Sequence, residues 1–596
     1  MSHRIGIVDY EKCKPNKCNK ECTKKCPPNQ IGKKCIYIED VEEIGSLSGG
    51  KKAIIANNLC IGCGACAKVC PFDAIQIVNL PHELTKEKML ISYGENSFRV
   101  YMRPHLKKGY CMGIIGSNGL GKTSIIGLLS GETNAINIKE KKRLLVGSET
   151  YSYLEKLYDK KLRVSYKPQD IAFFNRTNGD KKVQEYLDVM QDDMLVKMEL
   201  KKLSNRTVNQ LSGGETQRLL ISIKCAEAAD SYLFDEPTAF LDIKQRITAS
   251  QLIRDKCGNA YLILIEHDLC IFDYVSDYVT ALYGKKGAYG VISSISTTLE
   301  GINNYLEGWL PAENIKFRDK PIRFRYTEMN DEIMTRSEHV YGPYVHNYNK
   351  SGFSLEIERG TFSTSEITLL IGENGTGKTT MIQILAGLTV IADGSEKREN
   401  KMPELSVSIK KQNVYETCDE KTFDFIYKKI GNMMYDGNFK NIVINPLDIE
   451  KLYDLNVNTL SGGQMQRVAI TVCLGKPADM YLLDEPSAYI DIEDRITISR
   501  ILKQFIFANK KSMFLVEHDL IMATCTCDKV IVFTGEPGLN CKAMAPTDIK
   551  SGINTFLSVL GVTMRKDKNT GRPRINKMNS QQDQEQKKNG HFFMIE

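Results

Sequence analysis

Two short stretches of this chain, far apart in the sequence, are almost identical. LSGGETQR runs from Leu211 to Arg218, and LSGGQMQR runs from Leu460 to Arg467. Each copy follows a glycine-rich loop and precedes an Asp-Glu pair and then a histidine, in the same order. Equivalent motifs lie roughly 250 residues apart throughout, which indicates an internal duplication. The chain is therefore expected to contain two related halves of one fold.

Both glycine-rich loops have the sequence context of a nucleotide-binding P-loop. GSNGLGKT at Gly116–Thr123 and GENGTGKT at Gly372–Thr379 each follow a strand-like apolar run and precede a helix-like one. Backbone N–H groups at such a helix start cradle phosphates, the lysine reaches the outer phosphates, and the hydroxyl binds Mg²⁺. The residues predicted to bind ATP and Mg²⁺ are Gly116, Asn118, Gly119, Gly121, Lys122, Thr123 and Ser124, and then Gly372, Asn374, Gly375, Gly377, Lys378, Thr379 and Thr380.

An Asp-Glu pair follows a buried-strand pattern in each half, at Asp235–Glu236 and Asp484–Glu485. The aspartate is expected near Mg²⁺, and the glutamate is expected to polarise the attacking water. Later apolar runs end at histidines that are predicted to face the γ-phosphate. The further predicted site residues are the histidines His267 and His518, and the Mg²⁺-contacting glutamines Gln169 in YKPQD and Gln412 in IKKQN, of which the second is the poorer match.

The LSGG motif places a serine and two glycines at a predicted helix start, where open N–H groups bind anions. The order of P-loop, LSGG and Asp-Glu motifs resembles that of ATP-binding cassette proteins, and this resemblance implies that the serine serves the nucleotide of the other cassette. We therefore expect two head-to-tail composite sites, one combining Lys122 with Ser461 and the other combining Lys378 with Ser212. ATP then holds the cassettes together, and hydrolysis releases them. The predicted signature contacts are Ser212, Gly213, Gly214, Ser461, Gly462 and Gly463.

Nine of the 18 cysteines precede residue 71. Cys60–Pro71 reads C-x2-C-x2-C-x3-C-P, the spacing of two-cluster bacterial ferredoxins, and Cys13–Pro27 is a looser run that also ends in Cys-Pro. Zinc is the alternative, although zinc sites usually pair two C-x2-C knuckles across a longer gap. With the ferredoxin crossover, Cys13, Cys18, Cys22 and Cys70 hold one [4Fe–4S] cluster, Cys26, Cys60, Cys63 and Cys66 hold the other, and Cys35 is a spare cysteine expected to be buried filler.

Composition excludes several classes of protein. No apolar run reaches the roughly 18 residues of a membrane span, and the N-terminus lacks the apolar core of a signal peptide. Two cassettes without spans belong to a detached transporter subunit or to a soluble, cytoplasmic ATPase. The net charge of +7 permits an acidic partner such as RNA without arguing for one.

Lysines crowd the cysteine-rich region. They can compensate the negative charge of clusters, form an ordinary solvated face, or offer a basic rim to RNA phosphates. These lysines are Lys12, Lys14, Lys17, Lys20, Lys24, Lys25, Lys33, Lys34, Lys51 and Lys52.

Three other features concern the organisation of the chain. Glu149–Leu162 has no counterpart in the second half and is either a surface insertion that touches a partner or a plain solvated helix. RPRINK at Arg572–Lys577 is either a nucleic-acid contact or part of a packed hinge. The tripeptide GIN follows each half, at Gly301 and at Gly552, which suggests that the connecting segments are duplicated too.

A chain of 596 residues is too long for one core, so several domains are expected. The expected fold class is α/β, with two head-to-tail P-loop cassettes of the ABC type after a ferredoxin-like α+β iron–sulfur domain. The predicted boundaries are 1–80 for the iron–sulfur domain, 81–295 for the first cassette, 296–325 for a hinge, 326–545 for the second cassette and 546–596 for a hinge and tail.

The order of these motifs, with the flanking words CIGCGAC, FDEPTAFLD, LLDEPSAYID and RPRINK, closely resembles subfamily E of the ABC proteins. These are the iron–sulfur ribosome-recycling ATPases, also called RNase L inhibitors, and the resemblance covers nearly the whole chain. It implies an ATPase that splits ribosomes into subunits after termination or stalling, together with peptide release factor or its rescue homologue. It also implies binding to the small subunit and its rRNA, links to initiation factors, and an iron–sulfur domain that swings when ATP closes the cassettes.

The resemblance also assigns roles to particular side chains. Tyr93 and Phe98 match the adenine-stacking aromatics of the first site, and Tyr344 is the candidate in the second. Glu149–Leu162 resembles a shortened form of an insertion that meets ribosomal RNA. The clusters are expected to be structural, with redox catalysis as the alternative.

Two alternatives to a ribosome-splitting enzyme remain open: a factor that uses ATP as a clamp and only prevents subunit association, and a transporter subunit. The free chain is expected to be a monomer that does not bind membranes. Deleting residues 1–75 is expected to leave nucleotide binding intact.

Overall fold

The computed structural model describes residues 3–10, 12–41, 50–56, 59–80, 84, 86–94, 96–132, 145–256, 258–322, 324, 337–348, 352–388, 405–412 and 418–594. Contacts within the chain divide it into two compact units. Unit 1 comprises Met1–Pro237, Gln251–Glu266 and Val275–Pro321, and unit 2 comprises Thr238–Ser250, His267–Tyr274 and Ile322–Glu596. Within the described ranges, no helix combines the length and the apolar character needed to cross a membrane.

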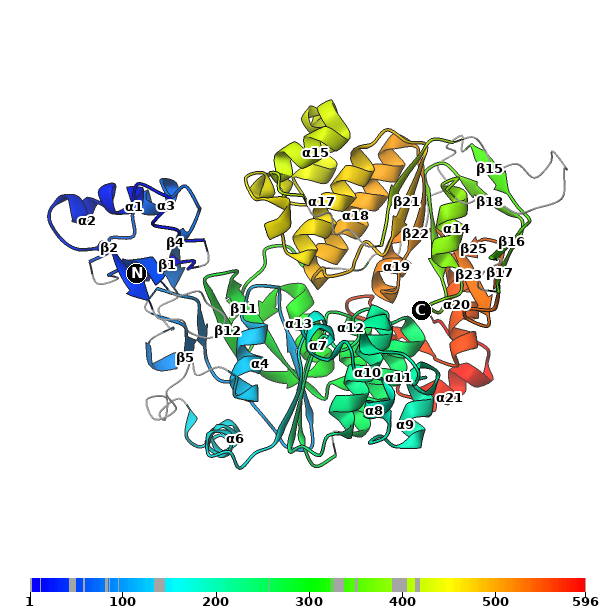
Figure 1. Ribbon diagram of the computed structural model, residues 1–596, viewed down its shortest axis with the longest axis horizontal. Coiled ribbons are helices and arrows are strands. Elements are labelled where there is room, and N and C mark those ends of the chain that lie inside the picture. Colours follow the sequence, from blue (N-terminus) through cyan, green and yellow to red (C-terminus); the bar gives the residue numbers. More distant parts are fainter. Residues whose placement is uncertain are drawn as a thin grey trace. The chain divides into compact units, whose positions relative to one another are not determined.

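The N-terminal lobe combines short strands and short helices around a cysteine-rich core (Figure 1). β1 (His3–Val8) pairs antiparallel with β4 (Ile75–Leu80), which joins the two ends of the lobe. β2 (Ile36–Val41) and β3 (Gly50–Ile55) form a second antiparallel pair. This lobe is the small α+β domain expected from the sequence. Its helices are α1 (Glu21–Lys24), α2 (Pro27–Gln30) and α3 (Ala65–Lys68).

The first P-loop belongs to an eight-stranded sheet. β7 (Cys111–Ile115), β10 (Tyr261–Ile265) and β9 (Ser231–Asp235) pair in parallel, and all their residues are buried. Continuous apolar runs are needed here because both faces of a parallel sheet are covered. The remaining strands are β5 (Met89–Ser92), β6 (Arg99–Tyr101), β8 (Val164–Lys167), β11 (Tyr278–Lys285) and β12 (Tyr289–Thr297). The strand order is β5-β6-β12-β11-β7-β10-β9-β8.

The second P-loop belongs to a sheet with the same arrangement. β19 (Glu366–Ile371), β22 (Ser512–Val516) and β21 (Met480–Asp484) are again parallel and buried. The remaining strands are β16 (Tyr344–Tyr348), β17 (Phe353–Ile357), β20 (Val407–Lys410), β23 (Lys529–Gly535), β24 (Asn540–Ala543) and the short β25 (Thr547–Asp548). The order β16-β17-β24-β23-β19-β22-β21-β20 places each motif strand at the position of its counterpart, which confirms the duplication.

Helices follow the motif strands in both halves. The first cassette contains α4 (Lys122–Ser130), α6 (Glu149–Tyr158), α7 (Ala172–Asn178), α8 (Gln184–Leu187), α9 (Asp192–Lys197), α10 (Gly213–Ala226), α11 (Ile243–Asp255) and α12 (Leu269–Val275). The second contains α14 (Lys378–Leu385), α15 (Thr422–Ile430), α16 (Gly437–Phe439), α17 (Gly462–Gly475), α18 (Ile492–Asn509) and α19 (Leu520–Thr526), with a separate strand pair, β15 (Glu338–Tyr341) and β18 (Gly360–Ser363).

Helix α6 is not the surface insertion, nor the plain solvated helix, considered from the sequence. Tyr153 and Leu154 on this helix are almost fully buried in the core of the first cassette. The Tyr153 hydroxyl donates to the carbonyl of Leu129 at 2.7 Å, and its oxygen lies 3.0 Å from the Ser231 hydroxyl. The amphipathic pattern of this segment therefore marks a helix that packs on the sheet.

The two GIN tripeptides lie in equivalent helices, α13 (Thr298–Glu307) and α20 (Ile549–Leu560). A Cβ atom at Gly301 would lie 2.9 Å from Val279 Cβ on β11, and one at Gly552 would lie 2.6 Å from Val530 Cβ on β23. Both glycines are thus required for close packing of the helix on its sheet. Other connecting elements are β13 (Trp309–Leu310), β14 (Ile315–Lys316), β26 (Met564–Lys566), β27 (Pro573–Ile575) and α21 (Gln581–Lys588).

The RPRINK segment is packed inside unit 2. The Arg572 side chain is fully buried, and its Nη1 lies 3.2 Å from Asp273 Oδ2. Arg574 donates to the same carboxylate from Nε at 2.6 Å. Both arginines therefore donate hydrogen bonds to the carboxylate of Asp273 on α12. This pairing favours the packed-hinge interpretation over a nucleic-acid contact.

Candidate nucleotide sites and cysteine clusters

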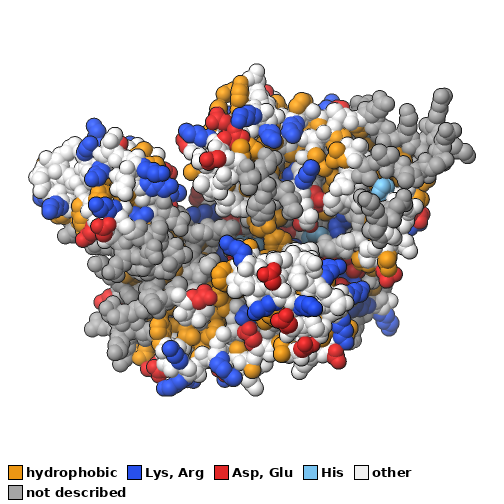
Figure 2. Space-filling model, in the orientation of Figure 1, with side chains coloured by type: hydrophobic (Ala, Val, Ile, Leu, Met, Phe, Trp, Pro, Cys, Tyr) orange, Lys and Arg blue, Asp and Glu red, His pale blue; other side chains and the backbone are white. Residues whose placement is uncertain are grey.

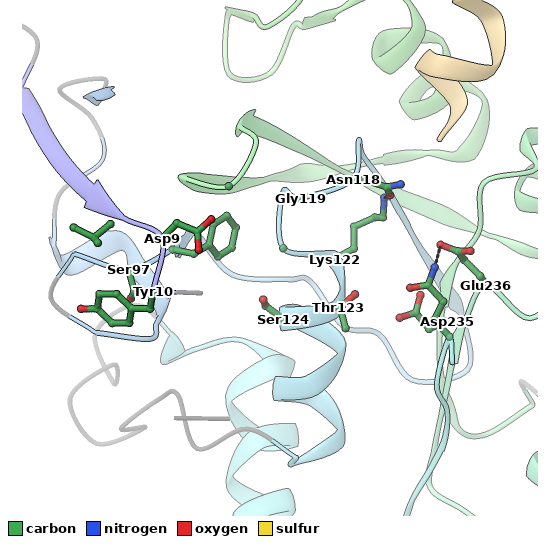
Figure 3. A pocket seen from close by; sticks show the side chains of 15 residues that line it. Asp9, Tyr10, Ser97, Asn118, Gly119, Lys122, Thr123, Ser124, Asp235 and Glu236 are labelled. Carbon is green, nitrogen blue, oxygen red and sulfur yellow. Dashed lines mark hydrogen bonds between the residues drawn. The ribbon is translucent and has the colours of Figure 1, made fainter. Parts of the chain in front are cut away.

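The first P-loop closes over a cavity of about 370 Å³ (Figure 3). Gly119 and Gly121 have φ of 79° and 95°, a left-handed backbone that favours glycine. Lys122 begins α4, and its Nζ donates to Gly116 O at 2.6 Å and to Asn118 Oδ1 at 3.0 Å. The loop is therefore preorganised around its lysine. Among the residues predicted from the P-loop, Asn118, Gly119, Gly121, Lys122, Thr123 and Ser124 line this cavity.

An aromatic ring and three residues of the N-terminal lobe, Val8 at the end of β1 and then Asp9 and Tyr10, form another part of the same cavity wall. A Cβ atom on Gly121 would lie 2.8 Å from the ring of Phe98, so this ring packs directly on the P-loop. Tyr93 packs against the cassette core instead and does not line the cavity. Asp9 and Tyr10, which follow β1, do line it, on the side away from Asp235 and Glu236 (Figure 3). No sequence motif indicated these two residues.

The carboxylates of the first site lie at the end of β9. Gln169 Nε2 donates to Glu236 Oε1 at 2.8 Å, which joins two residues that the sequence had selected separately. Burial raises the pKa of Asp235 to about 7, and the neighbouring Glu236 adds to this effect. Asp235 Oδ2 is buried and has no hydrogen-bond partner within the described part of the chain. A buried carboxylate oxygen in this position fits a Mg²⁺ ion that also contacts nucleotide phosphates.

The second site repeats this geometry. Lys378 Nζ donates to Gly372 O at 2.9 Å, and Thr379 Oγ1 donates to Asp484 Oδ2 at 3.1 Å. The hydroxyl and the carboxylate are thus close enough to share one Mg²⁺ ion. Gln412 Nε2 donates to Glu485 Oε1 at 2.8 Å, the same contact as in the first site despite the weaker sequence match. A cavity of about 430 Å³ lies beside α14, and Thr379, Gln412 and Asp484 line it.

The two predicted histidines are buried after equivalent strands. His267 follows β10 and is 5% exposed, and His518 follows β22 and is 4% exposed. His518 Nε2 lies 3.6 Å from Glu485 Oε1. Burial, with the nearby charge of Lys378, holds the pKa of His518 well below its usual range, so this ring is neutral.

The proposed adenine contact in the second cassette needs correction. Tyr344 is only 3% exposed and belongs to the cassette core, so its ring has no free face for a base. Phe353 at the start of β17 takes the place that Phe98 has in the first cassette. A Cβ atom on Gly377 would lie 3.0 Å from the Phe353 ring. The packing of each ring on its P-loop glycine shows this equivalence.

Both signature motifs form helix starts. Ser212 precedes α10 and accepts a hydrogen bond from the backbone N–H of Glu215, whose side chain accepts from the Ser212 N–H in return. Ser461 and Gln464 form the same capping box at α17. This reciprocal arrangement leaves the glycines in the first helical turn. The glycines are Gly213, Gly214, Gly462 and Gly463.

The segment after the first Asp-Glu pair contacts the second P-loop within unit 2. Asp242 is 2% exposed, and its Oδ2 accepts a hydrogen bond from the N–H of Asn374 at 2.8 Å. Lys244 Nζ lies 3.0 Å from Glu373 Oε2. Residues of the first half therefore help to shape the second P-loop.

Eight of the cysteines in the N-terminal lobe form two groups. Cys13, Cys18, Cys22 and Cys70 line one small cavity. Burial raises the pKa of Cys22 to about 12, and the other three thiols of the cavity each raise it further. A soft donor set of four cysteines around one cavity fits an iron–sulfur cluster.

The second group gathers around Cys66. Burial raises its pKa to about 11, and Cys60, Cys26 and Cys63 add to the effect. Cys35 is fully buried beside Cys26 and Cys60, which both raise its pKa. The structure thus brings the cysteines together in the two sets that the ferredoxin crossover predicts, with Cys35 next to the second set.

Nine of the ten lysines singled out from the sequence are exposed, and Figure 2 shows Lys and Arg side chains over the surface of the lobe. Lys52 is the exception, with 7% exposure. Its Nζ donates to the carbonyls of Tyr10 and Cys13, so it is a structural residue of the lobe.

Comparisons with known proteins agree with these sites. The ABC transporter family matches residues 102–239 and 355–488, and the 4Fe-4S binding domain matches residues 53–76. Residues 3–34 match a family described as a possible Fer4-like domain in RNase L inhibitor, RLI. The match to a 4Fe-4S family favours a cluster over the zinc alternative.

Full-length relatives and solved structures are similar to the whole chain. ABC transporter E family member 1 of Arabidopsis thaliana is 42% identical, with 100% of this chain and 99% of the relative covered. Translation initiation factor RLI1 of Saccharomyces cerevisiae is 40% identical, with 100% and 98% covered. A structure of ribosome-bound archaeal Pelota and ABCE1 matches with a TM-score of 0.88 and 37% identity, covering 99% of each chain. A complex of archaeal ribosomal stalk protein aP1 with the recycling factor aABCE1 matches with a TM-score of 0.79 and 35% identity, covering 86% of this chain and 100% of the other. The chain therefore belongs to the E family of ABC proteins, as an ABC-type ATPase with an iron–sulfur domain.

Proposed function

We propose that this chain splits ribosomes into subunits after termination or stalling, using ATP binding and hydrolysis to move its iron–sulfur domain. The observation that carries the proposal is the wall of the first nucleotide cavity, where Asp9 and Tyr10 of the N-terminal lobe lie beside the P-loop. A change in nucleotide state at this site acts on the lobe directly. Solved structures that match 86% or more of this chain are described as ribosome-bound or as a recycling factor, which supports the ribosome as the target.

In the proposed reaction, Glu236 and Glu485 each polarise a water molecule that attacks the γ-phosphate. The two P-loop lysines bind the outer phosphates, and His267 and His518 face the γ-phosphate. Mg²⁺ supplies charge neutralisation when bound, through Thr123, Asp235 and Gln169 in one site. The corresponding residues of the other site are Thr379, Asp484 and Gln412. Phe98 and Phe353 stack on adenine.

Two composite sites are proposed, in which Ser461 completes the site of Lys122 and Ser212 completes the site of Lys378. The contact of Asp242 with the second P-loop supports a head-to-tail pairing, because it places first-cassette residues beside the second nucleotide. The proposed domain boundaries are those expected from the sequence, although the positions near 81 and 326 lie outside the described residues.

The N-terminal lobe is proposed to hold two [4Fe–4S] clusters with a structural role. One is ligated by Cys13, Cys18, Cys22 and Cys70, and the grouping of these thiols around one cavity supports this pairing. The other is ligated by Cys26, Cys60, Cys63 and Cys66. Rigid clusters let a small lobe with a thin core transmit force.

The proposed partners are the small ribosomal subunit and its rRNA, a peptide release factor or its rescue homologue, and initiation factors, all met in the cytoplasm by a monomeric chain. The exposed lysines of the lobe are suited to rRNA phosphates. Co-sedimentation with purified small subunits tests this proposal. Binding should require a non-hydrolysable ATP analogue, and absent or nucleotide-independent binding contradicts it. A subunit-splitting assay then separates splitting from simple anti-association, because a clamp would bind without splitting.

A further inference from the structure

A buried lysine ends an edge strand of each cassette sheet, two residues before the glutamine that contacts the catalytic glutamate. Lys167 ends β8 and is 0% exposed, and Lys410 ends β20 and is 3% exposed. Fully buried lysines are rare, because removing an ammonium group from water is costly unless the group is well paired. A lysine retained at the same buried position in both halves therefore calls for a specific explanation.

Both lysines bind the same pair of backbone atoms. Lys167 Nζ donates to the carbonyls of Asp235 and Glu236 at 3.0 and 3.1 Å. Lys410 Nζ donates to the carbonyls of Asp484 and Glu485 at 2.7 and 2.9 Å. Each lysine thus spans the carboxylate pair on which the proposed hydrolysis depends.

The glutamate backbone is in a conformation that needs such support. Glu236 has φ of 45° and Glu485 has φ of 47°, in the left-handed region that non-glycine residues rarely adopt. Such a conformation persists only where its surroundings hold it. The glutamate N–H is fixed as well, by Ile265 O at 2.9 Å in the first site and by Val516 O at 3.0 Å in the second.

One strand end therefore holds each glutamate at two points. In the first site Lys167 fixes the backbone carbonyl, and Gln169 fixes the carboxylate at Oε1. Lys410 and Gln412 do the same for Glu485. The glutamine is recognised from sequence, whereas the lysine has remained without a role.

We propose that Lys167 and Lys410 are positioning residues for ATP hydrolysis. Each holds its glutamate in the left-handed conformation that directs the carboxylate to the attacking water. Each also places a positive charge beside two neighbouring carboxylates. The inference rests on the proposed role of the glutamates, but it concerns the chemical step alone and does not depend on the ribosome.

The test measures ribosome-free ATP turnover by the full-length protein in a Glu485→Gln background, so that only the first site turns over. Lys167→Met keeps the length and apolar stem of the side chain and removes its charge and donors. We expect kcat to fall roughly 10- to 100-fold, because small misplacements of catalytic groups have effects of this size. The Kd for nucleotide should stay within about twofold, since the lysine binds no phosphate in this arrangement. Lys410→Met in a Glu236→Gln background is the matched variant for the second site, and it should behave in the same way.

A double-mutant cycle distinguishes positioning from general damage. Adding Lys167→Met to Glu236→Gln should cause little further loss in first-site turnover, because the lysine acts through that glutamate. Losses that multiply, or an unchanged kcat in Lys167→Met, overturn the proposal. If the methionine variant does not fold, the test uses Lys167→Arg instead, because arginine retains the charge and the hydrogen-bond donors. It should keep nucleotide affinity with an intermediate kcat, and a raised KM with normal kcat would overturn the inference. Active Glu236→Gln protein would instead refute the role of the glutamate itself.

Discussion

The two nucleotide sites share a catalytic core and differ in what surrounds it. In both, a glutamine contacts the glutamate at 2.8 Å, and a buried lysine spans the Asp-Glu carbonyls. The first cavity has a wall from the N-terminal lobe, whereas the described residues that line the second cavity all belong to the second cassette. Duplication thus preserved the chemistry, and the fused lobe made one site different from the other.

Asn96 joins the lobe to the first site. It is fully buried, and its side chain donates to Gly6 O at 3.0 Å and accepts from the N–H of Ile55 at 2.7 Å. Its backbone carbonyl accepts from the N–H of Val8 at 2.8 Å. Asn96 lies two residues before Phe98, so the loop that reaches the nucleotide cavity is also bonded to the lobe. We therefore revise the expectation for a chain without residues 1–75, whose first site should lose part of its wall and bind nucleotide less tightly.

The largest expected effect tests the shared core. Glu236→Gln or Glu485→Gln removes the proposed base and keeps its shape, so the chemical step at that site should slow by roughly 10²- to 10⁴-fold while ATP still binds. In each single variant, single-turnover hydrolysis measures the rate of the chemical step at the site whose glutamate is unchanged. Equal losses at the two sites support an equivalent core, and normal hydrolysis in the double variant would refute the assignment.

Loss of one cluster is the next largest perturbation, and it should affect only one site. Cys22→Ser should remove about half of the roughly eight irons expected for two cubanes. It should also weaken nucleotide binding at the first site more than at the second, because β1 of the lobe leads into the first cavity. Iron analysis and site-resolved nucleotide titration measure both effects. Cys35→Ser is the control and should keep its iron; equal weakening at both sites would contradict the asymmetry.

Sequence reasoning succeeded where a function depends on neighbouring residues. The P-loops, the capping serines and the Asp-Glu pairs are local patterns, and the cysteine spacing predicted the two groups of thiols that lie together in the lobe. It failed where function depends on packing between distant segments. Asp9 and Tyr10 reach the first cavity only because Asn96 binds the lobe, and Phe353 replaces Tyr344 only because β17 passes the P-loop. Lys167 in YKPQD and Lys410 in IKKQN occur at the same position in both halves. Their role could not be predicted from the sequence, because it depends on hydrogen bonds to backbone carbonyls of the distant Asp-Glu pairs.

A smaller effect tests the aromatic rings of the two sites. Phe98→Ala should weaken first-site binding, and Phe353→Ala should weaken second-site binding, each by about 1–3 kcal/mol, the usual value of a base–aromatic stack. Tyr344→Phe is the matched control because this ring is buried in the core. Fluorescent-nucleotide titration of each variant provides the measurement. An unchanged affinity at the second site in Phe353→Ala would contradict the assignment of this ring.

The smallest expected effect concerns base selectivity, and it would sharpen the contrast between the sites most directly. Asp9 lines the first cavity on the side away from Asp235 and Glu236, which is where the base lies if the phosphates occupy the P-loop (Figure 3). A carboxylate there accepts a hydrogen bond from the amino group of adenine and repels the carbonyl oxygen of guanine. Asp9→Asn should therefore reduce the preference for ATP over GTP at the first site by a few-fold, about the 0.5–1.5 kcal/mol of one hydrogen bond. The second site, whose described lining residues all belong to the second cassette, should keep its preference. The measurement is competition between ATP and GTP in Glu236→Gln and Glu485→Gln backgrounds, which separates the nucleotide preferences of the two sites. Equal changes at both sites, or none at the first, would show that the lobe only encloses the nucleotide and does not recognise its base.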